Sequence, residues 1–306
     1  MAAERHDVVI VGAGAAGLSC ALECVDVRLD TVVYEAGVRV GGQLIEIPHL
    51  VRNVLGWRYD AGEDVLRAIE RSTAILGDCV RRAARVTAVD LPALAVEVGT
   101  ERIDARAVVL AMGARQQELP GAPDGAFGGD VSYLIEAQPG HFDGRDVVVI
   151  GGGDSATLDA LELAAAGSIV TLAHRASTLS ARADIVARVW AEPRVHDLPG
   201  WELDSLRGGD RLEEVVLRDA DGEQRCLPAG GLVVKIARVP NTELVRGQVE
   251  LDGRGSIVVD TALRTSLAGV FAAGDVTADS HPRIATAIGQ GVLAAHSVLR
   301  HLQARP

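Results

Sequence analysis

A strand, a glycine-rich turn and a helix near the start of the chain constrain its fold more than any other feature. The apolar run 8–11 predicts a buried parallel strand, and the sequence GAGAAG follows at residues 12–17, before a helix of small residues. Gly12 permits the tight turn, Gly14 lets the backbone approach a pyrophosphate, and Gly17 allows the helix to pack closely on the strand. The helix N-terminus supplies free N–H groups for the phosphates.

A second strand, residues 31–34, ends at Glu35, eighteen residues after Gly17. A carboxylate at this position accepts hydrogen bonds from ribose hydroxyls and repels a 2′-phosphate. The glycine motif alone is weak evidence, because a turn in any doubly wound domain can match it. With strand, helix and terminal acid in register, the sequence predicts binding of a dinucleotide whose ADP moiety carries no 2′-phosphate.

The same unit recurs 139 residues later. The strand 147–150 leads into Gly151-Gly-Gly153-Asp-Ser-Ala156, a helix of small residues and the strand 169–173. Recurrence at this spacing indicates a second dinucleotide-binding domain. Its second strand ends at His174 and Arg175 instead of an acid, so nothing repels a 2′-phosphate and one guanidinium can pair with it. The alternative for Arg175 is an ordinary solvated loop residue.

The end of the chain is expected to return to the first domain. A strand within 267–273 ends at Gly274-Asp275, where a carboxylate and a backbone N–H can meet a ribitol and a phosphate. The run 284–302 has the pattern of one long amphipathic helix. We therefore predict an α/β protein with two Rossmann-like, three-layer ββα domains: 1–116 with 245–306, and 117–244 inserted into it.

Composition excludes several other classes of protein. The 306 residues carry a net charge of −12, which argues against nucleic acid or an anionic membrane as the partner. No apolar run approaches the length of a membrane span and no signal peptide is evident, so we expect a cytoplasmic protein. We expect no metal site. The cysteines are too few and too scattered for a disulfide scaffold: Cys20, Cys24, Cys79 and Cys226.

Several blocks in one order resemble the low-molecular-weight thioredoxin reductase family of two-domain flavoproteins, which includes the ferredoxin/flavodoxin:NADP reductases. The resemblance covers essentially the full length. The blocks are GAGAAG (12–17), GGQL (41–44), VRNVLG (51–56), AMGAR (111–115), GGGDSA (151–156), HR (174–175), VPN (239–241) and AAGDV (272–276). The resemblance implies FAD in the first domain, NADPH or NADH in the second, and a homodimer.

This resemblance also implies two sets of binding residues. Those expected to hold FAD are Gly12, Gly14, Ala15, Ala16, Gly17, Glu35, Ala36, Gly42, Gln43, Leu44, Asn53, Val86, Ala111, Gly113, Gly274, Asp275, Arg283, Ile284 and Ala285. Those expected to hold NAD(P)H are Gly151, Gly153, Asp154, Ser155, Ala156, His174 and Arg175. Hydride transfer demands no side-chain acid or base, so we predict no catalytic residue.

The chain departs from the family where thioredoxin reductases carry Cys-x-x-Cys. That position is Leu134-Ile135-Glu136-Ala137, and it holds no cysteine. Tyr133 and the run 142–144 are similar to the ferredoxin/flavodoxin:NADP reductase branch, which also has no dithiol. The second nucleotide motif is poorer than the family's His-Arg-Arg-x-x-x-Arg, because Ala176 and Ser180 stand where arginines would be.

The sequence therefore predicts a FAD-dependent oxidoreductase that takes hydride from NAD(P)H and passes electrons to an unknown external acceptor, a protein or a small molecule, without an internal disulfide. Two alternatives stay open. One is a flavin-binding redox sensor or interaction module whose NAD(P)H site is weak or vestigial. The other is a reductase of a disulfide that belongs entirely to its partner.

Overall fold

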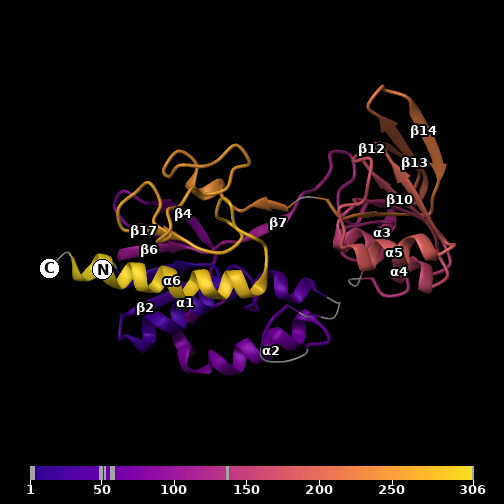
Figure 1. Ribbon diagram of the computed structural model, residues 1–306. Coiled ribbons are helices and arrows are strands. Elements are labelled where there is room, and N and C mark those ends of the chain that lie inside the picture. The colour runs from indigo at the N-terminus through magenta and orange to yellow at the C-terminus, as the bar shows by residue number, and fades with distance from the viewer. Residues whose placement is uncertain are drawn as a thin grey trace. The chain divides into compact units, whose positions relative to one another are not determined.

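A computed structural model describes residues 4–47, 51, 53–55, 59–135, 138–236 and 238–304 (Figure 1). Arg52, Gly56, Glu136 and Ala137, which belong to segments discussed above, lie outside the described residues. The chain forms two compact units. Unit 1 runs up to Arg115 and resumes at Val239, and unit 2 is Gln116–Arg238. The crossings fall in two short strands that pair with each other, β7 (Ala114–Gln116) and β16 (Arg238–Pro240).

Unit 1 is built on five parallel strands in the order β3-β2-β1-β6-β17. The apolar strand predicted at 8–11 is the C-terminal half of β1 and is buried on both faces. The long strand β6 pairs with β17 through its second half and, antiparallel, with β5 through its first half. The bounds are β1 Glu4–Val11, β2 Thr31–Tyr34, β3 Val80–Arg81, β4 Val86–Asp90, β5 Ala95–Val98, β6 Glu101–Leu110 and β17 Val270–Ala272.

Helices cover one face of this sheet. α1 (Ala15–Asp26) and α6 (Ile284–Gln303) lie side by side there, as Figure 1 shows, and pack on alternate strand residues such as Val8 and Ile10. The opposite strand residues, such as Val9 and Val11, form a second core with β4, β5 and the segment 245–257. The long helix predicted at 284–302 is thus confirmed. The remaining helices are α2 (Gly62–Ser72) and the 3₁₀ turns η1 (Gly42–Glu46), η2 (Ala74–Cys79) and η4 (Glu243–Val245).

Unit 2 repeats the plan. Its parallel sheet has the order β11-β10-β9-β15-β8, with helices α4 and α5 on one face and the antiparallel strands β12, β13 and β14 on the other. The bounds are α3 Ala126–Gly129, β8 Val131–Ser132, β9 Asp146–Ile150, α4 Asp154–Ala165, β10 Ile169–His174, α5 Ala183–Ala191, β11 Val195–Pro199, β12 Trp201–Gly208, β13 Leu212–Asp219, β14 Gln224–Pro228 and β15 Gly231–Val234.

Both units therefore have the three-layer ββα architecture predicted from the sequence, and unit 2 is inserted into unit 1. The predicted fold class is confirmed. Within the described residues, no helix is both long and apolar enough to cross a membrane.

Candidate functional site

The first glycine turn joins β1 to α1 with the geometry that its residues imply. Gly12 has a positive φ of 103°, and a Cβ there would lie 2.5 Å from the carbonyl oxygen of Ala111. A Cβ on Gly17 would collide with the carbonyl of Gly12. Gly14 precedes α1 in extended conformation, and a Cβ on it would meet no atom within 4 Å. The helix N-terminus therefore has the open approach that a pyrophosphate needs.

Three further segments converge on this turn. The N–H of Gly41 donates to the carbonyl of Ala13 at 2.8 Å, which places η1 against the turn. A Cβ on Gly42 would lie 3.6 Å from the Cα of Gly14. Gln43 Nε2 donates to Asp275 Oδ2 at 3.0 Å, so η1 also contacts the residues that follow β17.

Glu35 is held by the backbone on both oxygens. Its Oε2 accepts from the N–H of Ala13 at 2.8 Å, and its Oε1 accepts from the N–H of Gly37 at 2.7 Å. These bonds orient the carboxylate at the end of β2, beside the turn. Each oxygen keeps a further lone pair, so the group can still accept from ribose hydroxyls.

The structure brings several of the residues predicted for FAD to the first glycine turn. Gly113, with φ of 62°, would carry a Cβ 3.6 Å from Gln43 Nε2, and Ala111 follows β6 beside Gly12. Asn53 is in an exposed bend, and Val86 is buried in the core on the face of the sheet opposite α1. The remaining predicted residues are Ala15 and Ala16 in the first turn of α1, Ala36 exposed beside Glu35, Leu44 buried in η1, and Arg283, Ile284 and Ala285 at the start of α6.

The second glycine turn joins β9 to α4 in the same way. Gly151 has φ of 138°, and a Cβ on it would collide with the carbonyl of Lys235. Gly153 precedes α4 in extended conformation. Of the first helical residues, Ser155 is exposed and Ala156 is buried. The replacement of the third glycine by alanine is accommodated by this packing.

Some polar side chains around this turn have partners within the protein, and another is exposed to solvent. His174 is 4% exposed, and its Nε2 lies 2.9 Å from Asp197 Oδ1, whereas Arg175 is exposed. The carboxylate of Asp154 accepts from the backbone N–H of Arg182 at 2.8 Å and pairs with its guanidinium at 3.3 Å. Arg175 is therefore an exposed cation directly after β10.

Sequence reasoning missed three residues that contact the predicted sites. Gln290 of α6 accepts from the N–H of Gly274 at 2.7 Å. Asn241 donates to the carbonyl of Met112 at 2.8 Å. Lys235 pairs through Nζ with Asp159 Oδ2 of α4 at 3.1 Å. Asn241 is the last residue of the block VPN (239–241), and Lys235 is the only lysine in the sequence, whereas Gln290 had no signal.

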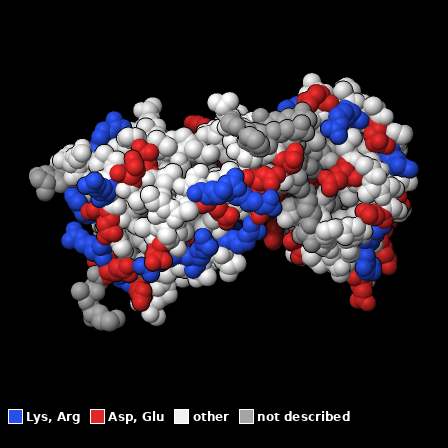
Figure 2. All heavy atoms as spheres, turned by 90° about the horizontal axis from the view of Figure 1, so that it is seen from below, with Lys and Arg blue, Asp and Glu red and all other residues white. Residues whose placement is uncertain are grey.

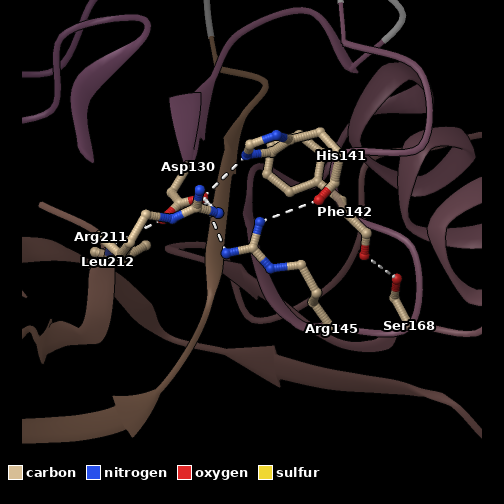
Figure 3. Close-up of polar contacts among 7 residues, drawn as sticks. All are labelled: Asp130, His141, Phe142, Arg145, Ser168, Arg211 and Leu212. Atoms are coloured by element: carbon tan, nitrogen blue, oxygen red, sulfur yellow. Dashed lines mark hydrogen bonds and ion pairs between the residues drawn. The ribbon is translucent and has the colours of Figure 1, made fainter. Parts of the chain in front are cut away.

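A charged cluster is centred on Asp130, which precedes the position where thioredoxin reductases carry their dithiol (Figure 3). Asp130, fully buried before β8, accepts from His141 at 2.9 Å, Arg145 at 2.9 Å, and Arg211 at 2.6 and 2.8 Å. It also accepts from the N–H of Leu212 at 3.0 Å. Burial by itself raises the pKa of Asp130, but these donors and cations outweigh it and lower the pKa below its ordinary value. The carboxylate of Asp130 therefore binds two residues that follow that position, His141 and Arg145.

Among the described residues, no group of three or more His, Cys, Asp or Glu side chains is placed to hold a metal ion. All four cysteines are free. Cys20 and Cys24 are buried together in α1, and the hydrogen bond between the Cys20 thiol and Cys24, together with burial, raises the pKa of Cys20 well above its ordinary value. Cys20 is therefore held as a thiol within the core.

Comparison with known proteins places this geometry in one family. Residues 6–291 match the family model described as pyridine nucleotide-disulphide oxidoreductase. The thioredoxin reductase of Mycolicibacterium smegmatis is 37% identical over 303 residues, which covers 97% of this chain and 96% of that protein. A 34.2 kDa protein in the rubredoxin operon of Clostridium pasteurianum is 30% identical over 296 residues, with 95% and 96% covered.

Solved structures agree with these relatives. The crystal structure of thioredoxin reductase from Lactococcus lactis matches with a TM-score of 0.88 at 27% identity, covering 98% of this chain and 99% of that one. Thioredoxin reductase from T. acidophilum matches with a TM-score of 0.86 at 27% identity, covering 99% and 100%. With two glycine turns in two Rossmann-like units and relatives along its whole length, the chain belongs to the pyridine nucleotide-disulphide oxidoreductase family, as a thioredoxin reductase-like flavoprotein.

Proposed function

We propose that the chain is a FAD-dependent oxidoreductase that accepts hydride from NAD(P)H and delivers electrons to an acceptor outside the chain, without an internal redox disulfide. Bound FAD supplies the redox chemistry, and the protein supplies binding and orientation. The observation that carries the proposal is the pair of open glycine turns, each at the N-terminus of a helix that follows a buried parallel strand. A pyrophosphate fits each of them.

Unit 1 has the residues to hold FAD. The carboxylate of Glu35 is fixed for the adenosine ribose, and Gly14 and Gly42 leave space for the pyrophosphate. Asp275, which accepts a hydrogen bond from Gln43, would contact the ribitol, and the N–H of Gly274 is held by Gln290. Unit 2 would hold NAD(P)H over Gly151–Asp154, with Arg175 available to a 2′-phosphate. We also propose a homodimer, by analogy with the family.

The absence of an internal dithiol is supported by the sequence and by where the cysteines lie. No two cysteines are separated by two residues, and the residues at 134–137 are Leu-Ile-Glu-Ala. Cys20 and Cys24 are buried in α1, while Cys79 is half-buried and Cys226 is exposed in unit 2. Electrons on a flavin would therefore leave the chain directly, as in the dithiol-free branch that the sequence resembles.

The acceptor is constrained by charge. The net charge is −12, and acidic and basic side chains are interspersed over the face drawn in Figure 2. A strongly acidic protein acceptor would be repelled by the net charge of this chain. We therefore favour a small molecule or a protein that is not strongly acidic.

One observation favours the redox-sensor alternative. Of the three arginines in the family's second motif, only Arg175 is kept. Ser180, at the position of another, donates instead to the carbonyl of Gly152 at 3.2 Å. With fewer arginines to pair with the 2′-phosphate, the site binds NADPH less tightly relative to NADH. If the site bound neither cofactor, the protein would be only a flavin-binding module. Reduction of a partner's disulfide is the third reading, and it needs no cysteine from this chain.

Anaerobic stopped-flow measurements test the proposal directly. Mixing the purified flavoprotein with NADPH or with NADH is expected to bleach the flavin absorbance at about 450 nm within seconds. The ratio of the two rates at subsaturating cofactor measures what Arg175 contributes. A flavin that stays oxidised at saturating concentrations of both cofactors would contradict the enzyme and favour the redox sensor.

A variant without cysteines tests the route of the electrons. Replacing Cys20 and Cys24 by alanine, and Cys79 and Cys226 by serine, is expected to leave flavin reduction and its reoxidation by an artificial acceptor unchanged within about twofold, because no thiol lies on the proposed route. FAD content, measured by absorbance, is the control for folding. Loss of turnover in a variant with full FAD content would reveal a thiol mechanism.

A further inference from the structure

Lys235 occupies an unusual place for the only lysine of the chain. Every other residue among the 30 lysines and arginines is an arginine. Lys235 follows β15 directly, and its N–H donates to the carbonyl of Ile150, the last residue of β9, at 2.8 Å. It therefore lies at the carboxyl ends of two adjacent parallel strands, which is the edge where open α/β sheets bind their ligands.

The strand order reverses at this point. From β9 the chain builds β10 and β11 on one side, while β15 and β8 lie on the other. A dinucleotide binds across such a reversal, with its adenosine half beside the strand that follows the first helix. That strand is β10, which ends at His174 and is followed by Arg175. The other half of the dinucleotide, the nicotinamide riboside, is then on the side of β15, where Lys235 is found.

The side chain of Lys235 is committed to an ion pair. Its Nζ lies 3.1 Å from Asp159 Oδ2, and the two side chains are 11% and 2% exposed. Asp159 faces inward from α4, beside the buried Ala156 and Ala160. A buried pair of this kind adds little stability over apolar residues of the same volume, so its presence at a ligand-binding edge calls for another reason.

The chemistry of the pair selects among ligand groups. The ammonium of Lys235 has three N–H donors, and Asp159 Oδ2 engages one of them. The pair carries no net charge, so it suits uncharged polar acceptors, such as an amide or a hydroxyl, better than a phosphate. The guanidinium of an arginine is wider and planar, whereas the ammonium of lysine is a compact donor. This difference is a reason for a lysine at this position in a chain that otherwise uses arginine.

We propose that Lys235, positioned by Asp159, binds the nicotinamide riboside end of the dinucleotide in unit 2. The inference rests on the proposed NAD(P)H-binding function and adds a residue to it. It predicts that Lys235 contributes equally to NADH and NADPH binding, because the two cofactors share this end of the molecule.

Binding of two ligands to the holoprotein tests the assignment. Tetrahydro-NADH has the complete dinucleotide but cannot reduce the flavin, whereas ADP has the adenosine and both phosphates alone. Calorimetric titration of Lys235→Met is expected to show tetrahydro-NADH bound about tenfold more weakly, as for a lost charged hydrogen bond. ADP binding is expected to be unchanged. Lys235→Arg should recover part of the loss. The control is Arg194→Met, which also removes one positive charge, at an exposed residue just before β11. This variant should bind both ligands like the wild type.

Chemical labelling gives a second measurement that does not depend on a variant. Acetylation of the only ε-amino group, followed by mass spectrometry of its peptide, should be slowed by tetrahydro-NADH and not by ADP. Equal weakening of both ligands in Lys235→Met, or of neither, would overturn the assignment while leaving the proposed function intact. A wild-type protein that binds neither ligand would overturn both.

Discussion

Replacing Gly291 by alanine is expected to deprive the protein of its bound flavin. Gly291 lies in α6 where this helix crosses α1, and a Cβ there would collide with the carbonyl of Ala16, while approaching the Cβ of Ser19 at 2.8 Å and the backbone N of Cys20 at 2.9 Å. Backbone atoms cannot rotate away, so the two helices must separate. Overpacking of this kind costs about 1–3 kcal/mol and more where backbone must move.

The loss should reach the cofactor because α1 begins at the first glycine turn. Ser19 also donates to the carbonyl of Ile288 at 2.9 Å, and a shifted α6 would break this bond and move Gln290 away from Gly274. Flavin content per mole of purified protein, read from the absorbance spectrum, is the measurement.

Gly289→Ala is the matched control for this prediction. Gly289 is exposed two residues earlier in the same helix, and a Cβ on it would meet no atom within 4 Å. Alanine is favoured over glycine in a helix interior by about 1 kcal/mol, so this variant should keep its flavin and unfold at an equal or higher temperature. Equal flavin content in Gly291→Ala and Gly289→Ala would show that the contact between α1 and α6 does not control the site.

Asp130→Asn is expected to destabilise unit 2 by about 3–5 kcal/mol, because it leaves Arg145, Arg211 and His141 around a neutral amide in a buried place. Hydrogen exchange of peptides from 116–238 measures this change unit by unit, which suits a protein of two units better than one global transition. Asp143→Asn, an exposed change in the same segment, should leave the exchange rates unchanged.

The effect of Asp130→Asn should depend on pH in one direction. The folded protein holds the pKa of Asp130 below its ordinary value, so the stabilisation is fully present above the unfolded pKa of about 3.9. It is lost as pH falls through the lower pKa of the folded state. The difference in exchange between wild type and variant should therefore shrink below about pH 4. A difference that stayed constant down to pH 2 would show that the carboxylate is not ionised in the native cluster.

Local sequence was sufficient to predict the glycine positions of the two turns, because backbone geometry dictates them. Gly12, Gly17 and Gly151 are required by positive φ or by close approach within a few residues of their own strand, so their pattern is readable without a structure. The α/β class and the long helix α6 follow from periodicity in the same way.

Contacts between distant segments could not be predicted. Gln43 meets Asp275 across 232 residues, and Arg211 meets Asp130 across 81, and no local pattern encodes either pair. His174 shows the opposite difficulty. The motif includes it among ligand-binding residues, but the direction of its side chain depends on Asp197 in β11, which a pattern in β10 does not contain. Its role in binding NAD(P)H stays a prediction.

The insertion of unit 2 into unit 1 sets the order in which the protein can fold as it is synthesised. Unit 2 is contiguous, so all of its residues have been made before residue 270 is added. Unit 1 must wait, because β17 completes its sheet beside β6 and α6 covers α1. Until then the part of that face which α6 will cover is exposed apolar surface, a target for chaperones. The half predicted to bind FAD is therefore begun first and finished last.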